Sequence, residues 1–174
     1  MSPRASSVRF MTPGRWAVIG ALAFILLLLV FHLYYQWAQS DYSREERAAV
    51  RVAMEEGGIA DAKRADKFVW DEKVWVVFGE DREGNRQYVW VADDGVAAVP
   101  LEDAYPSDRL KQDVRREHPD ADIIRIRPGL AEGKRIWEVY YSRPENGKRY
   151  YYGFYGFEDG KPVATYRLPA RTAN

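Results

Sequence analysis

An uncharged stretch near the N-terminus constrains this chain more than any other feature. From Trp16 to Tyr35 no side chain is charged, apart from any proton on His32. Twenty residues of helix, at about 1.5 Å each, span roughly 30 Å, the thickness of a bilayer's hydrocarbon core. The run from Leu26 to Phe31 is apolar on every face, which favours a transmembrane helix over the alternative, a buried core helix. We therefore expect one transmembrane anchor over residues 16–37.

Charges on either side of this stretch predict its orientation. Arg4, Arg9 and Arg15 precede it, and the first 35 residues contain no acidic residue. A basic flank favours the cytoplasm, so residues 1–15 are predicted to be cytoplasmic and the remainder extracytoplasmic, in a single-pass protein of the cell membrane. Ala38 and Ser40 would suit a signal-peptidase site, which is the competing interpretation. The apolar stretch is longer than the usual 7–15 residues of a signal-peptide core, and this length favours an uncleaved anchor.

The composition of the remaining residues excludes several classes of function. The chain has no cysteine, so it can form no disulfide, thiolate metal site or thiol nucleophile. Residues 36–106 carry 9 basic and 16 acidic residues, a net charge of −7, whereas residues 107–174 carry 14 and 10, a net charge of +4. These opposite charges could bring the two halves together or steer one toward a charged partner, or they are simply two solvated surfaces. Neither half is basic enough to predict nucleic-acid binding.

The pattern of caps, strands and turns occurs twice. Ser43 and Glu46 fit a capping box that opens a helix to about Glu56, and Gly57-Gly58 ends it. Ser107 opens a second helix, which Pro119 ends. Four strand-like segments follow each helix, with Gly129 in the first turn of the second set. The eight segments are 62–69, 74–78, 87–92 and 96–101, then 122–127, 135–142, 149–157 and 162–168.

We therefore expect an α+β protein with two tandem units, over residues 40–103 and 106–170. Each unit is predicted to be a helix packed on a four-stranded antiparallel sheet. In most sheets of this kind the face away from the helix is polar. Here the strands carry large apolar residues on both faces, as Trp75 and Val77 alternate with Val74, Val76 and Phe78. The outer faces must be covered by the sister unit or by another protein.

Two segments of the chain resemble a known protein family. One is Lys73-Val74-Trp75-Val76-Val77-Phe78-Gly79 with the following Tyr88-Val89-Trp90-Val91, and the other is Ile136-Trp137-Glu138-Val139-Tyr140-Tyr141. In order and spacing over about residues 40–170, the chain resembles the TseB-like (YpmB-like) cell-wall elongation regulators of Gram-positive bacteria. The resemblance implies an N-terminal anchor, two cystatin-like domains and no catalytic activity. It also implies a penicillin-binding protein, a transpeptidase of lateral wall synthesis, as the partner. The apolar stretch itself predicts contact with the lipid bilayer, and peptidoglycan is a further candidate partner.

The residues offer little material for catalysis. After the apolar stretch there is one histidine, His118, and a nucleophilic triad needs a base beside its nucleophile. Serines in the same part are few: Ser40, Ser43, Ser107 and Ser142. Acidic pairs such as Asp93-Asp94 fall at hairpin turns, where solvated carboxylates are ordinary. We expect no catalytic residue, no metal and no cofactor.

Aromatic residues are densest from Tyr150 to Phe157. In a strand, Tyr150, Tyr152 and Phe154 share one face, and Tyr151, Tyr155 and Phe157 share the other. The run is either core and interdomain packing or an exposed platform. An exposed platform beside basic residues would favour a wall polymer, and a flat apolar patch would favour a protein. Because tyrosine and arginine dominate binding hot spots, we predict the partner-binding residues to be Tyr141, Arg143, Tyr151 and Tyr155. Inhibition or chaperoning of extracytoplasmic proteases and structural binding of wall polymer are the alternative functions.

Overall fold

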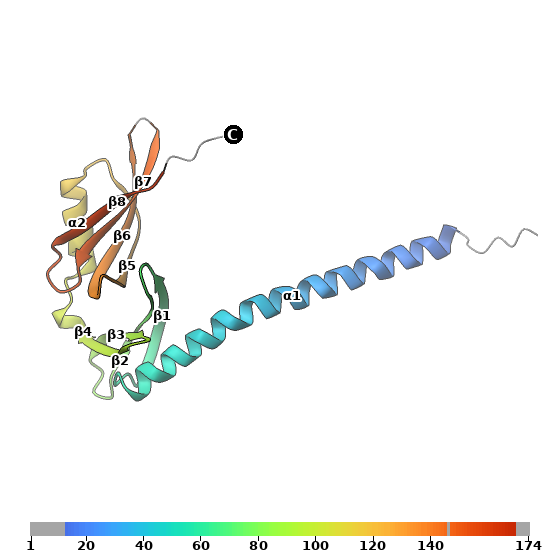
Figure 1. The fold of residues 1–174 in the computed structure, drawn as a ribbon, viewed down its shortest axis with the longest axis horizontal. Helices are drawn as coiled ribbons and strands as arrows, with labels where there is room; N and C mark the ends of the chain where they lie inside the picture. The colour runs from blue at the N-terminus through green and yellow to red at the C-terminus, as the bar shows by residue number, and fades with distance from the viewer. Residues whose placement is uncertain (1–12, 146, 170–174) are drawn as a thin grey trace, which may run out of the picture. The chain divides into compact units, whose positions relative to one another are not determined.

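A computed structural model describes the backbone of residues 13–145 and 147–169, with side chains described from residue 16 except over residues 36–41. The chain divides into two compact parts, residues 1–45 and residues 46–174. The three N-terminal arginines, the side chain of Trp37, and Ala38 and Ser40 of the alternative cleavage site lie outside the described side chains. Figure 1 shows the order of the elements along the chain.

Helix α1 runs without interruption from Pro13 to Glu55. It contains the apolar stretch, and its last turns belong to the second compact part. The prediction that Ser43 caps a separate helix is wrong, because Ser43 lies inside α1. A cap needs a residue with non-helical backbone, and here the preceding residues are already helical. The predicted end is confirmed: the helix stops before Gly57 and Gly58, and Gly58 has a φ of 76°.

The first sheet follows α1 directly. It contains β1 (Asp61–Val69), β2 (Lys73–Glu80), β3 (Arg86–Ala92) and β4 (Gly95–Pro100), hydrogen-bonded in that order and antiparallel throughout. Its inner face packs on the end of α1 through a small core of Ala53, Ile59, Val77 and Val89. Gly57 allows the close approach, since a Cβ there would lie 2.5 Å from a methyl group of Val89.

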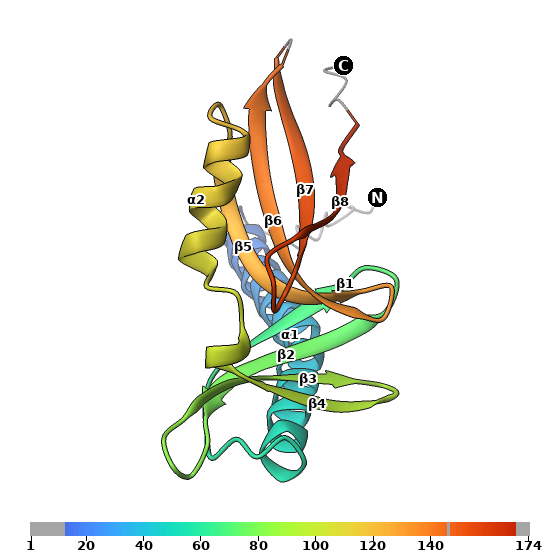
Figure 2. The same ribbon diagram turned by 90° about the vertical axis from the view of Figure 1, so that its left-hand side faces the viewer.

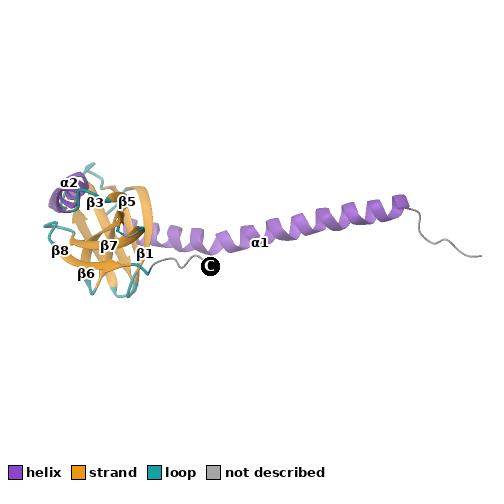
Figure 3. Cartoon of the chain, turned by 90° about the horizontal axis from the view of Figure 1, so that it is seen from above, coloured by secondary structure: helices purple, strands orange, loops and turns teal. Residues whose placement is uncertain are grey.

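The second sheet repeats this plan after a short 3-10 turn, η1 (Leu101–Asp103), and helix α2 (Ser107–Glu117). Strands β5 (Asp122–Ala131), β6 (Lys134–Pro144), β7 (Lys148–Gly156) and β8 (Pro162–Arg167) pair antiparallel in sequence order. Leu110 and Val114 of α2 are fully buried, as their shared helical face predicts. Figures 2 and 3 show α2 beside β5 on one side of the strands. The predicted α+β class and strand order are confirmed.

The two sheets share a local irregularity. Pairing of the first two strands shifts between Ala62 and Arg64 in the first sheet, and between Ile123 and Arg125 in the second. Each shift is a β-bulge, in which one extra residue bends the strand. The recurrence of a bulge at the same place in both sheets supports a repeated unit.

One predicted turn is wrong. Gly129 lies within β5, and the chain turns at Glu132 and Gly133, whose φ angles are 52° and 67°. Two consecutive positive φ angles make the tight hairpin that β-strand twist favours. Gly129 serves packing instead, because a Cβ there would lie 2.6 Å from the ring of Phe68 in the first sheet.

The outer face of the first sheet is covered by the second unit, as its two-sided apolar pattern predicts, in one large core that also contains the α2-facing side of the second sheet. This core contains residues of both sheets, including Phe68, Val76 and Trp90 from the first and Trp137 and Phe157 from the second. The ring of Trp90 lies 4.6 Å from that of Phe157, and its Nε1 donates a hydrogen bond of 3.0 Å to the carbonyl of Gly129. The second compact part is therefore one packed body with two sheets.

Candidate interaction surface on the second sheet

The aromatic run on β7 is divided between two environments. Tyr151 and Tyr155 face α2, together with Tyr141 from β6, and all three are buried, at 8%, 5% and 1% exposure. Phe154 faces the other way and is also buried, under Trp70 of the first sheet, whose ring centroid is 4.8 Å away. Only Tyr150 and Tyr152 remain partly exposed. The alternation of faces is as the sequence predicts.

The predicted contact residues therefore lie mostly inside the second sheet's own core. Tyr141 stacks on Tyr151 at 5.3 Å, and the hydroxyl of Tyr151 donates a 2.6 Å hydrogen bond to Glu145. Burial raises the pKa of Tyr155 well above its ordinary value near 10. Arg143 is the most accessible of the four, and it pairs with Asp120 at 3.0 Å and with Glu145 at 2.9 Å. Binding of a partner by these four residues stays a prediction.

A different group of aromatic side chains lines the side of the sheet that faces away from α2. We call it the outer tyrosine face, and it consists of Trp70, Tyr140, Tyr150, Tyr152 and Tyr166. The ring of Tyr140 stacks on Tyr150 at 5.7 Å and on Tyr152 at 4.9 Å. The ring of Trp70, from the turn between β1 and β2, lies 4.9 Å from that of Tyr166.

Cations lie against these rings. The guanidinium of Arg125 lies 5.6 Å from the centre of Tyr140, and the ammonium of Lys148 lies 5.8 Å from the centre of Tyr150. Arg125 also donates a 2.9 Å hydrogen bond to Glu138, a carboxylate with only 2% of its side chain exposed. Arg127 holds the same carboxylate through bonds of 2.9 and 3.1 Å, and its guanidinium lies 5.0 Å from the ring of Phe68. This network joins the outer tyrosine face to the contact between the sheets.

The geometry of the rings indicates what they can bind. Tyr140, Tyr150 and Tyr152 stand side by side with nearly parallel planes, so that neighbouring rings and cations cover much of their faces. Sugar rings stack on open aromatic faces, whereas ring edges, hydroxyls and arginines are the groups that protein interfaces use. The outer tyrosine face is therefore better suited to a protein surface than to a glycan strand.

The histidine and the serines that were considered for catalysis occupy structural positions in the fold. The ring of His118 stacks on that of Tyr141 at 5.7 Å, directly after the end of α2. Ser142 is buried on β6, and Ser107 is the first residue of α2 but makes no capping hydrogen bond. Among the described residues no group of three or more His, Asp or Glu side chains could hold a metal ion.

Trp70, Tyr140, Tyr166 and Arg125 were missed as site residues from sequence alone. Strand alternation predicts that Tyr140, Tyr150 and Tyr152 share a face once β6 and β7 are paired. It does not predict which face α2 covers, because both faces of β7 are aromatic. Trp70 reaches this surface from the first sheet, and no local pattern predicts that contact.

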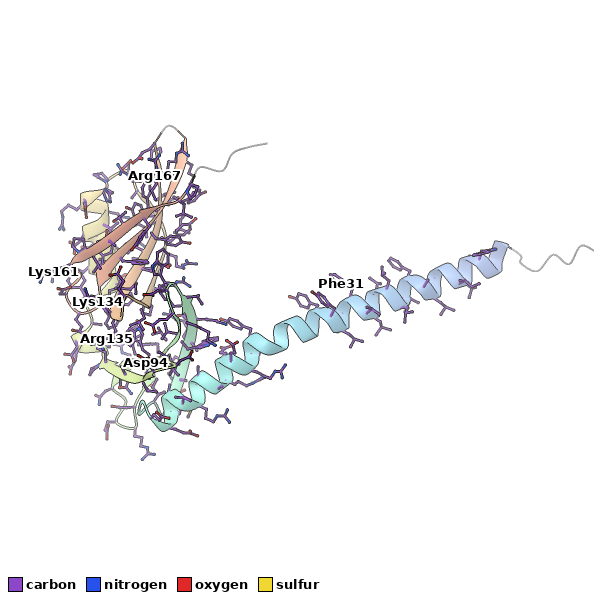
Figure 4. All side chains as sticks on the ribbon, viewed as in Figure 1. Phe31, Asp94, Lys134, Arg135, Lys161 and Arg167 are labelled. Atoms are coloured by element: carbon purple, nitrogen blue, oxygen red, sulfur yellow. The ribbon has the colours of Figure 1, made fainter. Side chains whose placement is uncertain are left out.

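One segment of the described chain is long and apolar enough to cross a membrane, the stretch Trp16–Tyr35 of α1. Its side chains are exposed along its whole length, and Phe31 projects from the helix in Figure 4. This exposure of apolar side chains is expected of a helix whose solvent is lipid. The stretch suggests a single-pass membrane anchor.

The chain combines an apolar N-terminal helix, which suggests a membrane anchor, with two tandem helix–sheet units. A family described as the cell wall elongation regulator TseB-like domain matches residues 48–92, which cover the end of α1 and strands β1–β3. The "Probable cell wall elongation regulator TseB" of Bacillus subtilis (strain 168) is 27% identical over 149 residues, which are 84% of this chain and 91% of that protein.

A solved structure, "YpmB protein from Bacillus subtilis", has a similar fold, with a TM-score of 0.65. It is 24% identical and covers 71% of this chain and 97% of its own. The chain is similar to the TseB-like family in its matched segment and in its fold, and the similarity to a probable cell wall elongation regulator supports a regulatory role.

Proposed function

We propose that this chain is a non-catalytic, membrane-anchored regulator of cell wall elongation that works outside the cytoplasm by binding a penicillin-binding protein. The observation that carries the proposal is the outer tyrosine face, a surface of tyrosines, a tryptophan and cations on an otherwise well-packed protein. These residue types are enriched at the energetic centres of protein interfaces. The similarity to a probable cell wall elongation regulator supplies the process in which such binding acts.

Anchoring explains how a modest surface can suffice. The partners would share one membrane, and confinement raises their effective concentration, so that weak contacts give substantial occupancy. In this proposal Tyr140, Tyr150 and Trp70 make the first contacts, and Arg143 is a further candidate contact. The buried Tyr141, Tyr151 and Tyr155 hold the second sheet in the shape that the partner binds.

The side of the membrane on which the second compact part lies can be tested by cysteine labelling. The chain has no cysteine of its own, so an introduced cysteine is the single site that can react. A single cysteine replaces Arg82, an exposed residue between β2 and β3, in the full-length chain. Intact cells are then treated with a membrane-impermeant maleimide. We expect Arg82→Cys to be labelled and the control Ser2→Cys to be labelled only after the cells are lysed. Labelling in the reverse order would place the sheets in the cytoplasm and reject the proposal.

The partner can be tested by affinity capture of the full-length protein from solubilised membranes, followed by mass spectrometry. We expect a penicillin-binding protein with the native chain, and much less of it with the double variant Tyr140→Ser/Tyr150→Ser. Tyr42→Ser, which removes an exposed tyrosine outside this face, is the matched control and should capture normally. Thermal unfolding must show that the double variant is folded. Equal capture by a folded double variant would remove this face, and the absence of any penicillin-binding protein would reject the proposed function.

A further inference from the structure

A groove lies where the two sheets and α2 come together. It has a volume of about 270 Å³ and is bordered by β5, by the first turns of α2, and by Arg64 and Tyr88 of the first sheet. Strand β5 is an edge strand of the second sheet, and its bulge falls at this border. Bulges at sheet edges often redirect a side chain toward a binding site.

Two buried aromatic rings lie at the floor of the groove. Tyr88 and Trp137 are both buried there, with their rings in an edge-to-face contact at 5.8 Å. The indole nitrogen of Trp137 donates a 3.0 Å hydrogen bond to the carbonyl of Tyr105, which fixes the orientation of the ring. Ile123 and Ile126 of β5 are half-buried along the wall. Most of the surface exposed within the groove is polar, so these rings act as a fixed support beneath it.

The bulge presents an isoleucine to the solvent at the rim. Ile124 has no partner residue on β6 in the register of the sheet, because pairing passes from Ile123 to Arg125. It lines the groove and is 49% exposed. An exposed isoleucine alone is unremarkable, but this one lies among the cations that line the same groove.

The rim carries an excess of positive charge. Arg64, Lys111 and Arg125 line the groove, and Asp108 is the single acidic residue among its lining. Arg64 pairs with Asp66 at 2.7 Å and Arg125 with Glu138 at 2.9 Å, yet both guanidinium groups keep about half of their side-chain surface exposed. Each guanidinium has further donors in a planar fork that suits carboxylates. The rim of the groove therefore combines one exposed isoleucine with three cations.

We propose that this groove docks an acidic segment of the protein partner, in which a large apolar side chain packs on Ile124 at the rim and neighbouring Asp or Glu residues meet the three cations. The proposal rests on the proposed function, because it takes the partner to be a protein. Complementary charge selects the segment and speeds its association, and the apolar side chain supplies affinity. Arg125 belongs to both surfaces, since it lines the groove and lies over Tyr140 of the outer tyrosine face.

The first test maps what touches the bulge. A photo-reactive p-benzoylphenylalanine replaces Ile124 in the full-length chain, and Val163, an exposed apolar residue on β8, is replaced in the matched control. After irradiation of membranes, the crosslinked peptide is sequenced by mass spectrometry. We expect Ile124 to crosslink to a segment of the captured penicillin-binding protein that contains a large apolar residue beside several acids. A segment without acidic residues, or a penicillin-binding protein captured but never crosslinked from position 124, would overturn the groove.

The second test exchanges charges. Lys111→Glu should weaken capture of the penicillin-binding protein about tenfold, whereas the matched Lys161→Glu, at an exposed site away from the groove, should not. Changing an acid of the crosslinked segment to lysine should restore binding to Lys111→Glu. Failure of this rescue would also reject the groove, with the proposed function intact.

A different outcome would be that the groove binds an anionic wall polymer in place of a protein segment, and this would overturn the proposal. Purified wall polymer would then bind the native chain, lose affinity with Lys111→Glu, and be indifferent to Ile124→Ser, because a polyanion makes no use of the apolar rim. The proposal expects Ile124→Ser to weaken capture. If no penicillin-binding protein is captured in any arm, it is the proposed function that fails.

Discussion

Glu138 is a residue whose burial needs explanation. Its carboxylate is almost completely enclosed between the two sheets, and it accepts hydrogen bonds from Arg125 and Arg127. A buried charge is tolerated only when it is paired and hydrogen-bonded. Arg127 also reaches the carbonyl of Lys67 at 3.4 Å, so that one carboxylate organises contacts on both sides of the junction. The network orients Arg125, the cation shared by the outer tyrosine face and the groove.

Glu138→Ala should therefore destabilise the second compact part by about 3 kcal/mol, because it leaves Arg127 partly buried without its carboxylate. Urea unfolding followed by tryptophan fluorescence measures this change. The matched variant Glu158→Ala breaks the more exposed pair with Arg135, at 2.7 Å, and should cost less than about 1 kcal/mol. Similar losses from the two variants would contradict the role given to Glu138.

The burial of Tyr155 predicts that the free energy of unfolding decreases at alkaline pH. Burial holds its pKa well above the ordinary 10, and burial also raises the pKa of Tyr88 and Tyr141. A phenol whose pKa is raised on folding contributes stability that is complete below the unfolded pKa and is lost as pH rises past it. We expect the free energy of unfolding to be nearly constant from pH 8 to about 10, and to fall above that.

The measurement is urea unfolding at several pH values, with tyrosine ionisation followed by absorbance near 295 nm. Tyr155→Phe should show a smaller decrease above pH 10 than the native chain, because one raised pKa is removed. An equal decrease in both proteins would show that Tyr155 does not contribute.

At the scale of elements, the strands and their order could be predicted from the sequence, whereas the structural roles of Ser43 and Gly129 could not. All eight strands appear within a few residues of their predicted bounds, because period-two alternation and turn residues are local signals. Ser43 and Gly129 were assigned to a cap and a turn, which are also local. Their actual positions depend on distant neighbours: α1 is already helical before Ser43, and Gly129 accommodates Phe68 from the first sheet.

The candidate surfaces were only partly predictable for the same reason. Alternation along β7 separates Tyr150 and Tyr152 from Tyr151 and Tyr155, but only the packed structure distinguishes the outer face from the face that α2 covers. The groove is harder still, since it needs a bulge at Ile124 and contributions from both sheets. Contacts between elements far apart in sequence leave no periodic signal.

Gly129 offers a test of the contact between the sheets. Gly129→Ala would place a methyl group 2.6 Å from the ring of Phe68, and overpacking of this kind costs about 1–3 kcal/mol. The double variant Gly129→Ala/Phe68→Leu should be less destabilised than the sum of the two single variants, because the smaller side chain relieves the clash. Thermal and urea unfolding of the three proteins give the coupling. Strict additivity would mean that the two residues do not meet.

At the scale of the whole molecule, the apolar stretch and the second compact part suit different surroundings, lipid and water. The stretch Trp16–Tyr35 has the exposed apolar surface of a helix that is solvated by lipid, whereas residues 46–174 form cores of their own. Both cores are built from residues after Ala49. Because the chain has no cysteine, these cores are held together without disulfides. The two cores therefore use no residue of the apolar stretch.

Deletion of residues 1–36 should therefore give a soluble and fully folded protein. The last turns of α1 remain, and they supply Ala53 to the core under the first sheet. We expect a single cooperative thermal transition by circular dichroism, and tryptophan fluorescence typical of buried indoles. Capture of the partner should fall sharply, because the effective concentration provided by the shared membrane is lost while the surface itself is unchanged. Fusion of the truncated chain to an unrelated single-pass anchor should restore capture. If the truncated chain is unfolded at neutral pH, or if the foreign anchor restores nothing although the protein is folded, then the native helix contributes more than location.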